Sequence, residues 1–140
     1  MAISVLTNAT VIVNGVTLSS RATKVTVTDT RDSVDVTTMG ATNKAVAKGL
    51  GDAKINVDFL QDFGAGMIHA TLQPLVGSTT PVAVEVRADS AARSATNPAA
   101  YLAGALLMNY SMLDGAVGAA SSISAEFINA STAGMTYPTS

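Results

Sequence analysis

The sequence SVDVTTMGATNKAVAKGLGDAKINVDF, residues 33–59, contains two short runs in which apolar and polar residues alternate. The first run is Ser33–Thr37 and the second is Lys54–Phe59. A period of two is that of a β-strand with one buried face, so we expect a strand at each run. In this phase, the apolar side chains that face a core are Val34, Val36, Ile55 and Val57.

The connection between these two strands, Thr38–Asp52, is much longer than a tight turn requires. A hairpin needs only about 2–5 loop residues, and a long connection in a small domain usually has a function or is ordered by a partner. Its alanine, glycine and lysine content offers little with which to build a core of its own. We therefore interpret Thr38–Asp52 as an arm that packs against another molecule.

The composition predicts one domain over residues 1–140, with 1–10 and 131–140 as terminal arms. Apolar residues make up 48% of the chain, enough for one core, whereas charged residues make up only 13%. That charged share is about half of the usual one for a soluble domain. Such a surface favours a subunit that is covered by copies of itself, and the alternative is a monomer with an unusually uncharged surface.

Several classes of protein are disfavoured by the charge pattern and by what the sequence lacks. The formal net charge is −2 and no basic patch is visible, which argues against a protein that grips nucleic acid by its phosphates. There is no cysteine for disulfides or a thiolate metal site. Met1–Thr10 does not resemble a signal peptide, and the apolar run Ala99–Met108 is about half of the roughly 20 residues that span a membrane. We expect a cytoplasmic site of synthesis and no membrane contact.

The remaining segments predict short strands, one helix and two loops. Asn14-Gly15 within Val11–Leu18 is typical of a type I′ hairpin turn. Polar residues at Asp29–Asp32 predict a break before the first alternating run, and Ser131–Ser140 is expected to be frayed or ordered by a partner. Further strands are expected at Lys24–Thr28, Pro81–Arg87, Leu102–Met112 and Ser122–Ile128, and loops at Ala88–Pro98 and Asp114–Ser121.

The one helix is expected within Gln61–Gly77. Its apolar residues at Ile68, Leu72, Leu75 and Val76 share a helical face, Asp62 or Gly64 could begin it, Pro74 would disturb its last turn, and Gly77 would follow its end. In the last two strands the phase predicts one face with Leu106, Met108, Tyr110 and Met112, and an inward face with Ile123, Ala125 and Phe127. The total is a mainly β fold, a β-sandwich or partly closed barrel with one flanking α-helix and a long inter-strand loop.

The sequence offers no catalytic, cofactor-binding or metal site, and we expect no enzyme. His69 is the only histidine, and without a nearby carboxylate cluster it is expected to be structural. Gly64-Ala65-Gly66 resembles the start of a dinucleotide-binding loop, but His69 occupies the position where that loop requires its third glycine. Gly49-Leu50-Gly51 is followed by Asp52 instead of the lysine of a phosphate loop.

Four segments resemble the small major tail (tail tube) proteins of long-tailed bacteriophages, especially those of actinobacterial phages. These are VDVTTMG at 34–40, GLGD at 49–52, NVDFLQDFGAG at 56–66 and SATNP at 94–98. The resemblance covers about residues 11–127 and lies in the sequences of these motifs and in their order along the chain. It implies hexameric rings, four strands from each subunit in a continuous inner barrel, a helix outside that sheet, and a long loop that reaches the next ring.

The resemblance assigns roles to residues that the pattern had singled out. The inter-ring loop would include Met39, Gly40, Lys44, Lys48, Gly49, Leu50, Gly51 and Asp52. If the valine and isoleucine positions face the core, the candidates for the lumen of the tube are Asp35, Thr37, Asn56, Asp58, Ser124 and Glu126. We expect Asp35, Asp58 and Glu126 to make that lining neutral to acidic, so that DNA slides without sticking. Lys44 and Lys48 would pair with carboxylates of the adjoining ring, and would share a helical face if the arm coils; otherwise they are solvated.

The expected function is therefore a structural virion protein whose stacked hexamers form a conduit for DNA passage into the host. It would be assembled in the host cytoplasm, located in the virion tail and joined by tail terminator, tape measure and distal tail proteins, with DNA passing through without specific binding. The alternatives are a capsid decoration or tail terminator protein, and a monomeric cellular β-sandwich binding domain with an exposed pocket or apolar patch.

Overall fold

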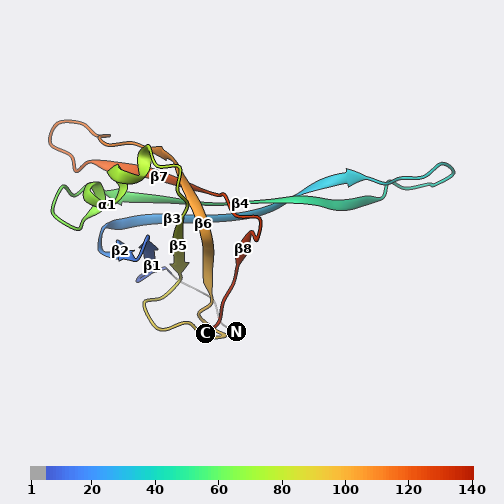
Figure 1. Ribbon diagram of the computed structural model, residues 1–140, viewed down its shortest axis with the longest axis horizontal. Coiled ribbons are helices and arrows are strands. Elements are labelled where there is room, and N and C mark those ends of the chain that lie inside the picture. The colour runs from blue at the N-terminus through green and yellow to red at the C-terminus, as the bar shows by residue number, and fades with distance from the viewer. Residues whose placement is uncertain (1–5) are drawn as a thin grey trace.

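The computed structural model describes residues 6–140 and shows one antiparallel sheet, one α-helix and one short 3-10 helix, η1 (Figure 1). The strand order is β2-β1-β5-β6-β7-β4-β3, and β8 pairs with β6 beside this path. The predicted mainly β fold with a flanking helix is confirmed, and the sheet is open rather than closed into a barrel. The elements are β1 Thr10–Val13, β2 Val16–Thr17, η1 Ser19–Arg21, β3 Ala22–Asp35, β4 Val46–Leu60, α1 Ile68–Val76, β5 Val82–Arg87, β6 Ala99–Tyr110, β7 Ser122–Asn129 and β8 Met135–Thr136.

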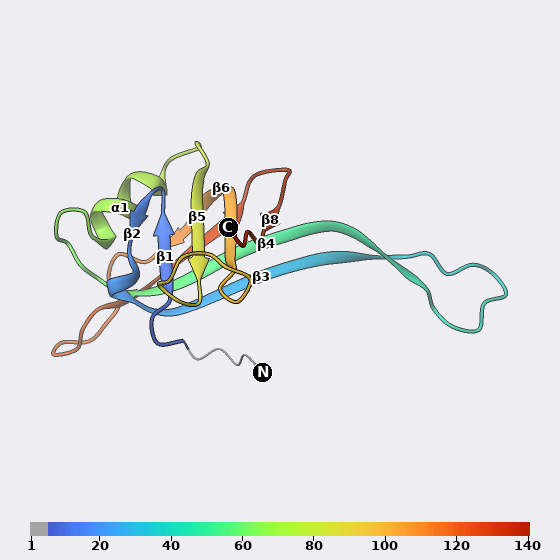
Figure 2. The same ribbon diagram turned by 90° about the horizontal axis from the view of Figure 1, so that it is seen from below.

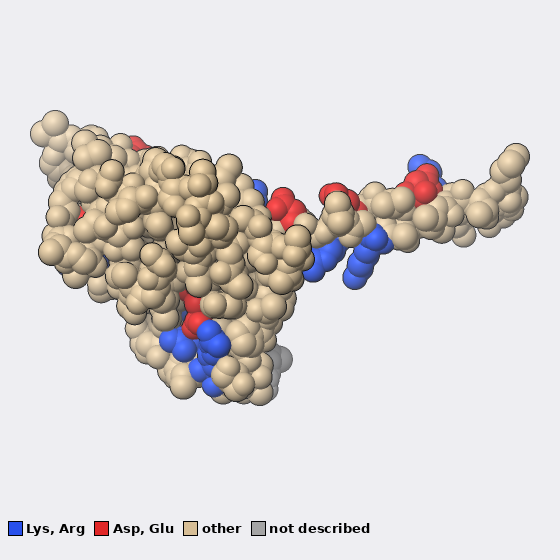
Figure 3. Space-filling view, in the orientation of Figure 1, with Lys and Arg blue, Asp and Glu red and all other residues tan. Residues whose placement is uncertain are grey.

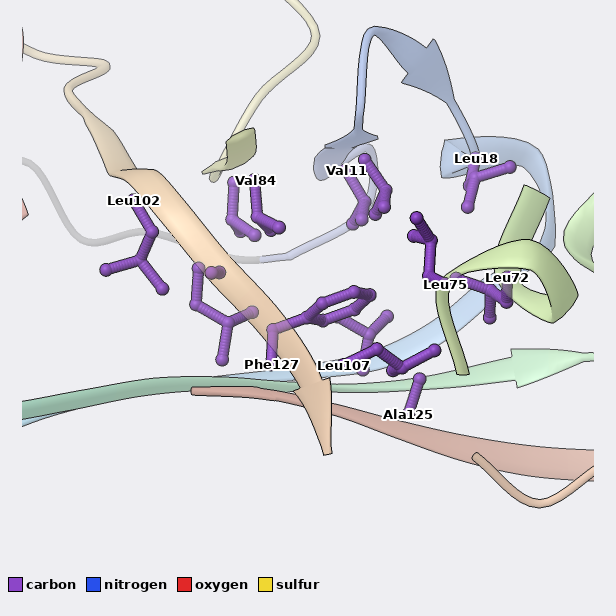
Figure 4. Close-up of a cluster of buried hydrophobic side chains, with 14 of the residues drawn as sticks. Val11, Leu18, Leu72, Leu75, Val84, Leu102, Leu107, Ala125 and Phe127 are labelled. Carbon is purple, nitrogen blue, oxygen red and sulfur yellow. The ribbon is translucent and has the colours of Figure 1, made fainter. Parts of the chain in front are cut away.

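The sheet bends so that its two halves enclose the core. Figure 2 shows β1, β2 and β5 running across the direction of β3 and β4. Figure 4 shows the side chains of Val11, Val84 and Leu102 on one side of the core and those of Ala125 and Phe127 on the other. The predicted inward positions of the second alternating run and of β7 are confirmed, because each of these side chains is buried: Ile55, Val57, Ile123, Ala125 and Phe127.

The hairpin that joins β1 to β2 turns where the sequence predicts. Asn14 and Gly15 have φ values of 50° and 81°. A type I′ turn needs positive φ at both central residues, and asparagine and glycine tolerate that region best. This turn lets β1 pair with β2 on one side and with β5 on the other.

The α-helix is shorter than the sequence predicts. It begins at Ile68 because Asp62, an expected first residue, serves the preceding loop instead. The Gly64 amide donates to Asp62 Oδ1 at 2.8 Å, and Arg21 Nε donates to Asp62 Oδ2 at 2.8 Å. These interactions lower the pKa of Asp62, the Gly64 hydrogen bond being the larger cause.

The buried face of α1 is formed by Ile68, Leu72 and Leu75, which pack on the core. Val76 was predicted to share this face and is 54% exposed, so that prediction was wrong. Pro74 lies in the last turn, and Gly77 follows the helix, both as predicted.

The prediction that Leu106, Met108, Tyr110 and Met112 share one face of β6 is wrong. A register shift between Leu107 and Asn109 inserts an irregularity into its pairing with β7. Leu102 and Leu107 point into the core, whereas Met108 is 61% exposed. A bulge of this kind reverses the phase of every later side chain, and simple alternation does not reveal it.

The C-terminal segment packs on its own chain, so the expectation of a frayed or partner-ordered tail is wrong. β8 pairs with β6 through Met135 opposite Leu102, and Met135 is buried. The Ala99 amide donates to the Pro138 carbonyl at 3.0 Å. Residues 1–5 of the expected N-terminal arm lie outside the described residues.

Candidate assembly surfaces

The predicted arm exists, but it is a long β-hairpin and not a loop. β3 and β4 stay paired from Ala22 opposite Phe59 to Asp35 opposite Val46, and the break expected at 29–32 is continuous strand. Strand pairing satisfies the backbone without a hydrophobic core, which explains how this glycine-rich sequence is ordered. Because β7 pairs with β4 only as far as Lys54, residues 30–52 pair only with one another in the part of the chain that the structure describes, and we call them the arm.

The connection at the tip of the arm is residues 36–45. Of the expected inter-ring loop, Met39, Gly40 and Lys44 lie there, whereas Lys48, Gly49, Leu50, Gly51 and Asp52 belong to β4. Lys44 and Lys48 do not share a helical face, because Lys48 lies in a strand.

Hydrogen bonds order the start of this tip. Asp35 Oδ1 accepts from the Thr37 amide at 2.9 Å, which lowers the pKa of Asp35. Thr37 Oγ1 accepts from the Ala45 amide at 2.8 Å, and the Val36 amide donates to the Ala45 carbonyl at 3.0 Å. The two sides of the hairpin are thus joined up to the tip.

The apolar side chains of the arm face solvent. Val34 and Val36, predicted to face the core, are each 48% exposed, because no other element of the described chain covers the arm. Val46 and Leu50 are more exposed still, and Met39 at the tip is fully exposed. The arm therefore leaves apolar surface uncovered, and an isolated two-stranded hairpin is only marginally stable in water.

The C-terminal segment braces the base of the arm. Tyr137 Oη donates to Asp29 Oδ2 at 2.6 Å, and Asp29 also forms an ion pair with Arg31. The hydrogen bond from Tyr137 is the main cause that lowers the pKa of Asp29, with Arg31 adding to it, and the same bond raises the pKa of Tyr137. Arg31 lies across Gly51, where an added Cβ would come within 2.5 Å of its Nη1.

A polar face covers the side of the β3-β4-β7-β6 sheet that points away from the core. Thr26 lies opposite Asn56, Asn56 opposite Glu126, and Glu126 opposite Asn109, forming one row across four strands. The next row places Lys24 opposite Asp58 and Asp58 opposite Ser124. These residues line a shallow groove of about 300 Å³.

The structure thus brings together four of the six candidate lumen residues, Asn56, Asp58, Ser124 and Glu126. Asp35 and Thr37 lie at the far end of the arm and do not join them. Sequence reasoning missed Lys24, Lys54 and Asn109. The alternation in 24–28 puts Lys24 on the face opposite Val25 and Val27, whereas the bulge in β6 concealed Asn109.

Two strand edges flank this polar face. β3 ends the sheet order, and within residues 6–140 it pairs only with β4 along its 14 residues. On the other side, β5 pairs with β6 only as far as Ala105, so residues 106–110 pair only with β7 among the described residues. Unpaired edges of this length attract further strands unless charge or a bulge protects them.

His69 joins the helix to the sheet. Its Nδ1 lies 2.9 Å from Tyr110 Oη, which also accepts a hydrogen bond of 2.9 Å from Gln61 Nε2. The Phe63 ring lies 5.2 Å from the imidazole, centroid to centroid. The contacts of this histidine are those of a packing residue.

The body of the protein carries a group of ion pairs around Glu85. Glu85 lies opposite Tyr101, is buried, and forms ion pairs with Arg87 and Arg93. Figure 3 shows charged side chains along the arm and in one group low on the body, while most of the remaining surface in that view is uncharged.

Within residues 6–140, no group of three or more His, Asp or Glu side chains could hold a metal ion. No helix in the same range is long and apolar enough to cross a membrane.

Solved structures share this architecture at low sequence identity. No protein-family model matches the chain, and no curated protein matches it by sequence. A chain from the virion of a native gene transfer agent particle superposes with a TM-score of 0.74 at 8% identity, covering 94% of this chain and 95% of that one. A chain from the tail of an empty gene transfer agent particle, refined as a helix with C6 symmetry, gives a TM-score of 0.65 at 9% identity, covering 84% of this chain and 82% of that one. The protein therefore has the fold of a virion and tail-particle subunit.

Proposed function

We propose that this chain is a tail tube subunit: six copies form a ring, the rings stack, and the bore conducts DNA. The observation that carries the proposal is the polar four-stranded face bounded by two unpaired edges. A neighbouring copy could add its β6 edge to the free edge of β3 and so continue the sheet. The sixfold symmetry of the tail particle with the same fold supports this arrangement.

The dimensions of such a ring suit a DNA conduit. Six copies with four strands each give 24 strands. At about 4.8 Å spacing and about 40° tilt the backbone ring is roughly 48 Å across, or about 37 Å without tilt. Either value leaves a bore wider than a DNA duplex after side chains are subtracted, and ring closure would remove the exposed strand edges.

The proposed lining is polar and nearly balanced in charge. Asp58 and Glu126 contribute negative charge, and Lys24 and Lys54 contribute positive charge on the same face. A groove that grips DNA neutralises many phosphates with clustered lysine and arginine, and this face has no such cluster. DNA would therefore pass without specific binding. Asp35 and Thr37 are not included in this lining, because they lie on the arm.

The arm is proposed to join one ring to the next. It projects from the body (Figure 1) and exposes apolar side chains, so it gains buried surface only when another copy covers it. The complete tube would lie in the virion tail, be assembled in the host cytoplasm, and be joined by tail terminator, tape measure and distal tail proteins. Subunits of this kind form structure and perform no catalysis.

The test is electron microscopy of the purified full chain beside a variant without the arm. In the variant, residues 31–51 are replaced by Asn-Gly, which joins the directly opposed pair Thr30 and Asp52 with a two-residue turn. We expect hollow tubes or six-membered rings from the full chain, and folded particles that no longer stack from the variant. Circular dichroism and a urea melt check that the variant is folded.

Three outcomes would contradict the proposal. A full chain that remains a small monomer at high concentration would support a cellular binding domain. Attachment only to preformed capsids would support a decoration protein. Tubes of normal length from the armless variant would leave ring formation intact and refute the role of the arm.

A further inference from the structure

A second exposed apolar surface lies at the end of the molecule opposite the arm. It is formed by the loop between β6 and β7 and the loop before α1, which lie at the left in both Figure 1 and Figure 2. These loops are joined by a hydrogen bond of 2.7 Å from Gln61 Nε2 to the Met112 carbonyl. We call the exposed apolar side chains of these two loops the end patch: Phe63 from the loop before α1, and Met112, Leu113 and Val117 from the β6–β7 loop.

The end patch and the arm hold the two most exposed large apolar side chains in the described chain. Val117 has a relative exposure of 107% and Met39 one of 101%. Each of these residues projects from a loop tip, and neither packs on the core. Because these two sites lie at opposite ends of one subunit, they can bury each other's apolar surface only when they belong to different copies.

The far part of the arm and the β6–β7 loop carry opposite charges, although the whole arm is balanced, with Arg31, Lys44 and Lys48 against Asp32, Asp35 and Asp52. Between Val36 and Leu50 the charged residues are Lys44 and Lys48, whereas the only charged residue of the β6–β7 loop is Asp114. All three side chains are exposed, and none forms an ion pair within residues 6–140.

We propose that the end patch is the docking site for the arm of a second copy of this chain in the adjacent ring. This inference rests on the proposed tube function and names the surface that receives the arm. Because the two surfaces differ and lie at opposite ends, their contact is heterologous and leaves a free arm and a free patch after each addition. Such a contact extends a stack of rings without closing it.

Disulfide trapping tests the contact directly, because the chain has no cysteine of its own. One preparation carries Val117→Cys, and a second carries either Met39→Cys or Leu50→Cys. The two are mixed, allowed to assemble and oxidised. Val117 belongs to the β6–β7 loop, and this loop and the arm lie at opposite ends of one copy (Figure 1), so any disulfide between these positions joins two copies.

We expect a crosslinked dimer from Val117→Cys with at least one of the two arm cysteines, and the reactive one reports which part of the arm covers the patch. The matched control is Ala95→Cys, an exposed position on the 88–98 loop, which should give at least tenfold less dimer with either arm cysteine. Tubes that form normally but give no dimer above this control would overturn the inference and leave the tube function intact. Failure to form rings or tubes at all would overturn both.

A charge exchange provides a second readout. Asp114→Lys places like charges together and should raise the concentration needed for assembly roughly 2- to 5-fold, the effect of one exposed ion pair. Adding Lys44→Glu and Lys48→Glu to the same chain should restore most of the loss. An assembly threshold unchanged by Asp114→Lys, or no recovery in the triple variant, would contradict the pairing.

Discussion

The two halves of the β3–β4 hairpin have similar sequences and different surroundings. Near its base, Val57 and Phe59 alternate with polar residues and are completely buried. In the arm, Val34 and Val46 belong to the same two strands and are 48% and 68% exposed. The difference shows that alternation specifies a strand, whereas burial depends on whether another element covers it.

The largest expected effect separates these halves by stability. Phe59→Ala in the base should lower the free energy of unfolding by about 3–5 kcal/mol, because it leaves a cavity in the core. Leu50→Ala in the arm should change it by no more than about 0.5 kcal/mol, because Leu50 is 83% exposed.

Urea melts of the unassembled subunit measure both effects. The full chain under the same conditions is the reference. A loss of more than about 2 kcal/mol from Leu50→Ala would show that the arm packs on its own body in solution, contrary to the structure.

A smaller effect is expected at the junction of the two halves. Tyr137→Phe removes the hydrogen bond to Asp29. Because this hydrogen bond is exposed to water, we expect the free energy of unfolding to fall by only about 1 kcal/mol. Amide hydrogen exchange should accelerate in residues 28–35 more than in β7. Tyr101→Phe is the matched control, because its hydroxyl makes no hydrogen bond within the described residues. Equal acceleration throughout the sheet in Tyr137→Phe would contradict a local brace.

The smallest effect concerns acid. The pKa of Asp62 is lowered by the Gly64 amide and Arg21, and that of Asp35 by the Thr37 amide. A lowered folded-state pKa contributes stability that is present above the unfolded pKa, near 4, and is lost as the pH falls through the folded value. Because Asp62 joins two parts of the body and the arm can open locally, Asp62→Asn should flatten the decline in stability below about pH 4 more than Asp35→Asn does.

Urea melts between pH 7 and pH 2.5 measure this difference, and carbon chemical shifts of the two carboxyl groups check the pKa values directly. An acid decline that Asp35→Asn removes and Asp62→Asn leaves would mean that the arm unfolds together with the body.

Sequence reasoning succeeded where local chemistry determines the structure. The Asn14-Gly15 turn, the inward face of β7 and the position of Gly77 after the helix follow from properties of a few adjacent residues. The presence of an arm followed from its length. The hairpin form of the arm could not be predicted from the sequence. The two segments within 30–52 pair through their backbone groups, and this pairing requires no pattern of buried apolar residues.

The candidate surfaces were only partly accessible from the sequence for a related reason. Asn56, Asp58, Ser124 and Glu126 were placed correctly on one face by simple alternation. Asn109 was not, because the bulge in β6 reversed the phase, and the end patch requires two loops distant in sequence to lie together. Asp62 failed as a helix start because its partners, Gly64 and Arg21, come from a turn and from η1.

The register shift between Arg31 and Ser33 has a mechanical consequence. Gly49 faces Asp32 and Val34 there with little room for a larger side chain, so the ladder changes step close to where the arm leaves the body. A paired ribbon is stiff along its length and yields first where its ladder is irregular. A filament linked by such ribbons would flex at a joint within each linker, so that curvature could be absorbed without parting one layer from the next.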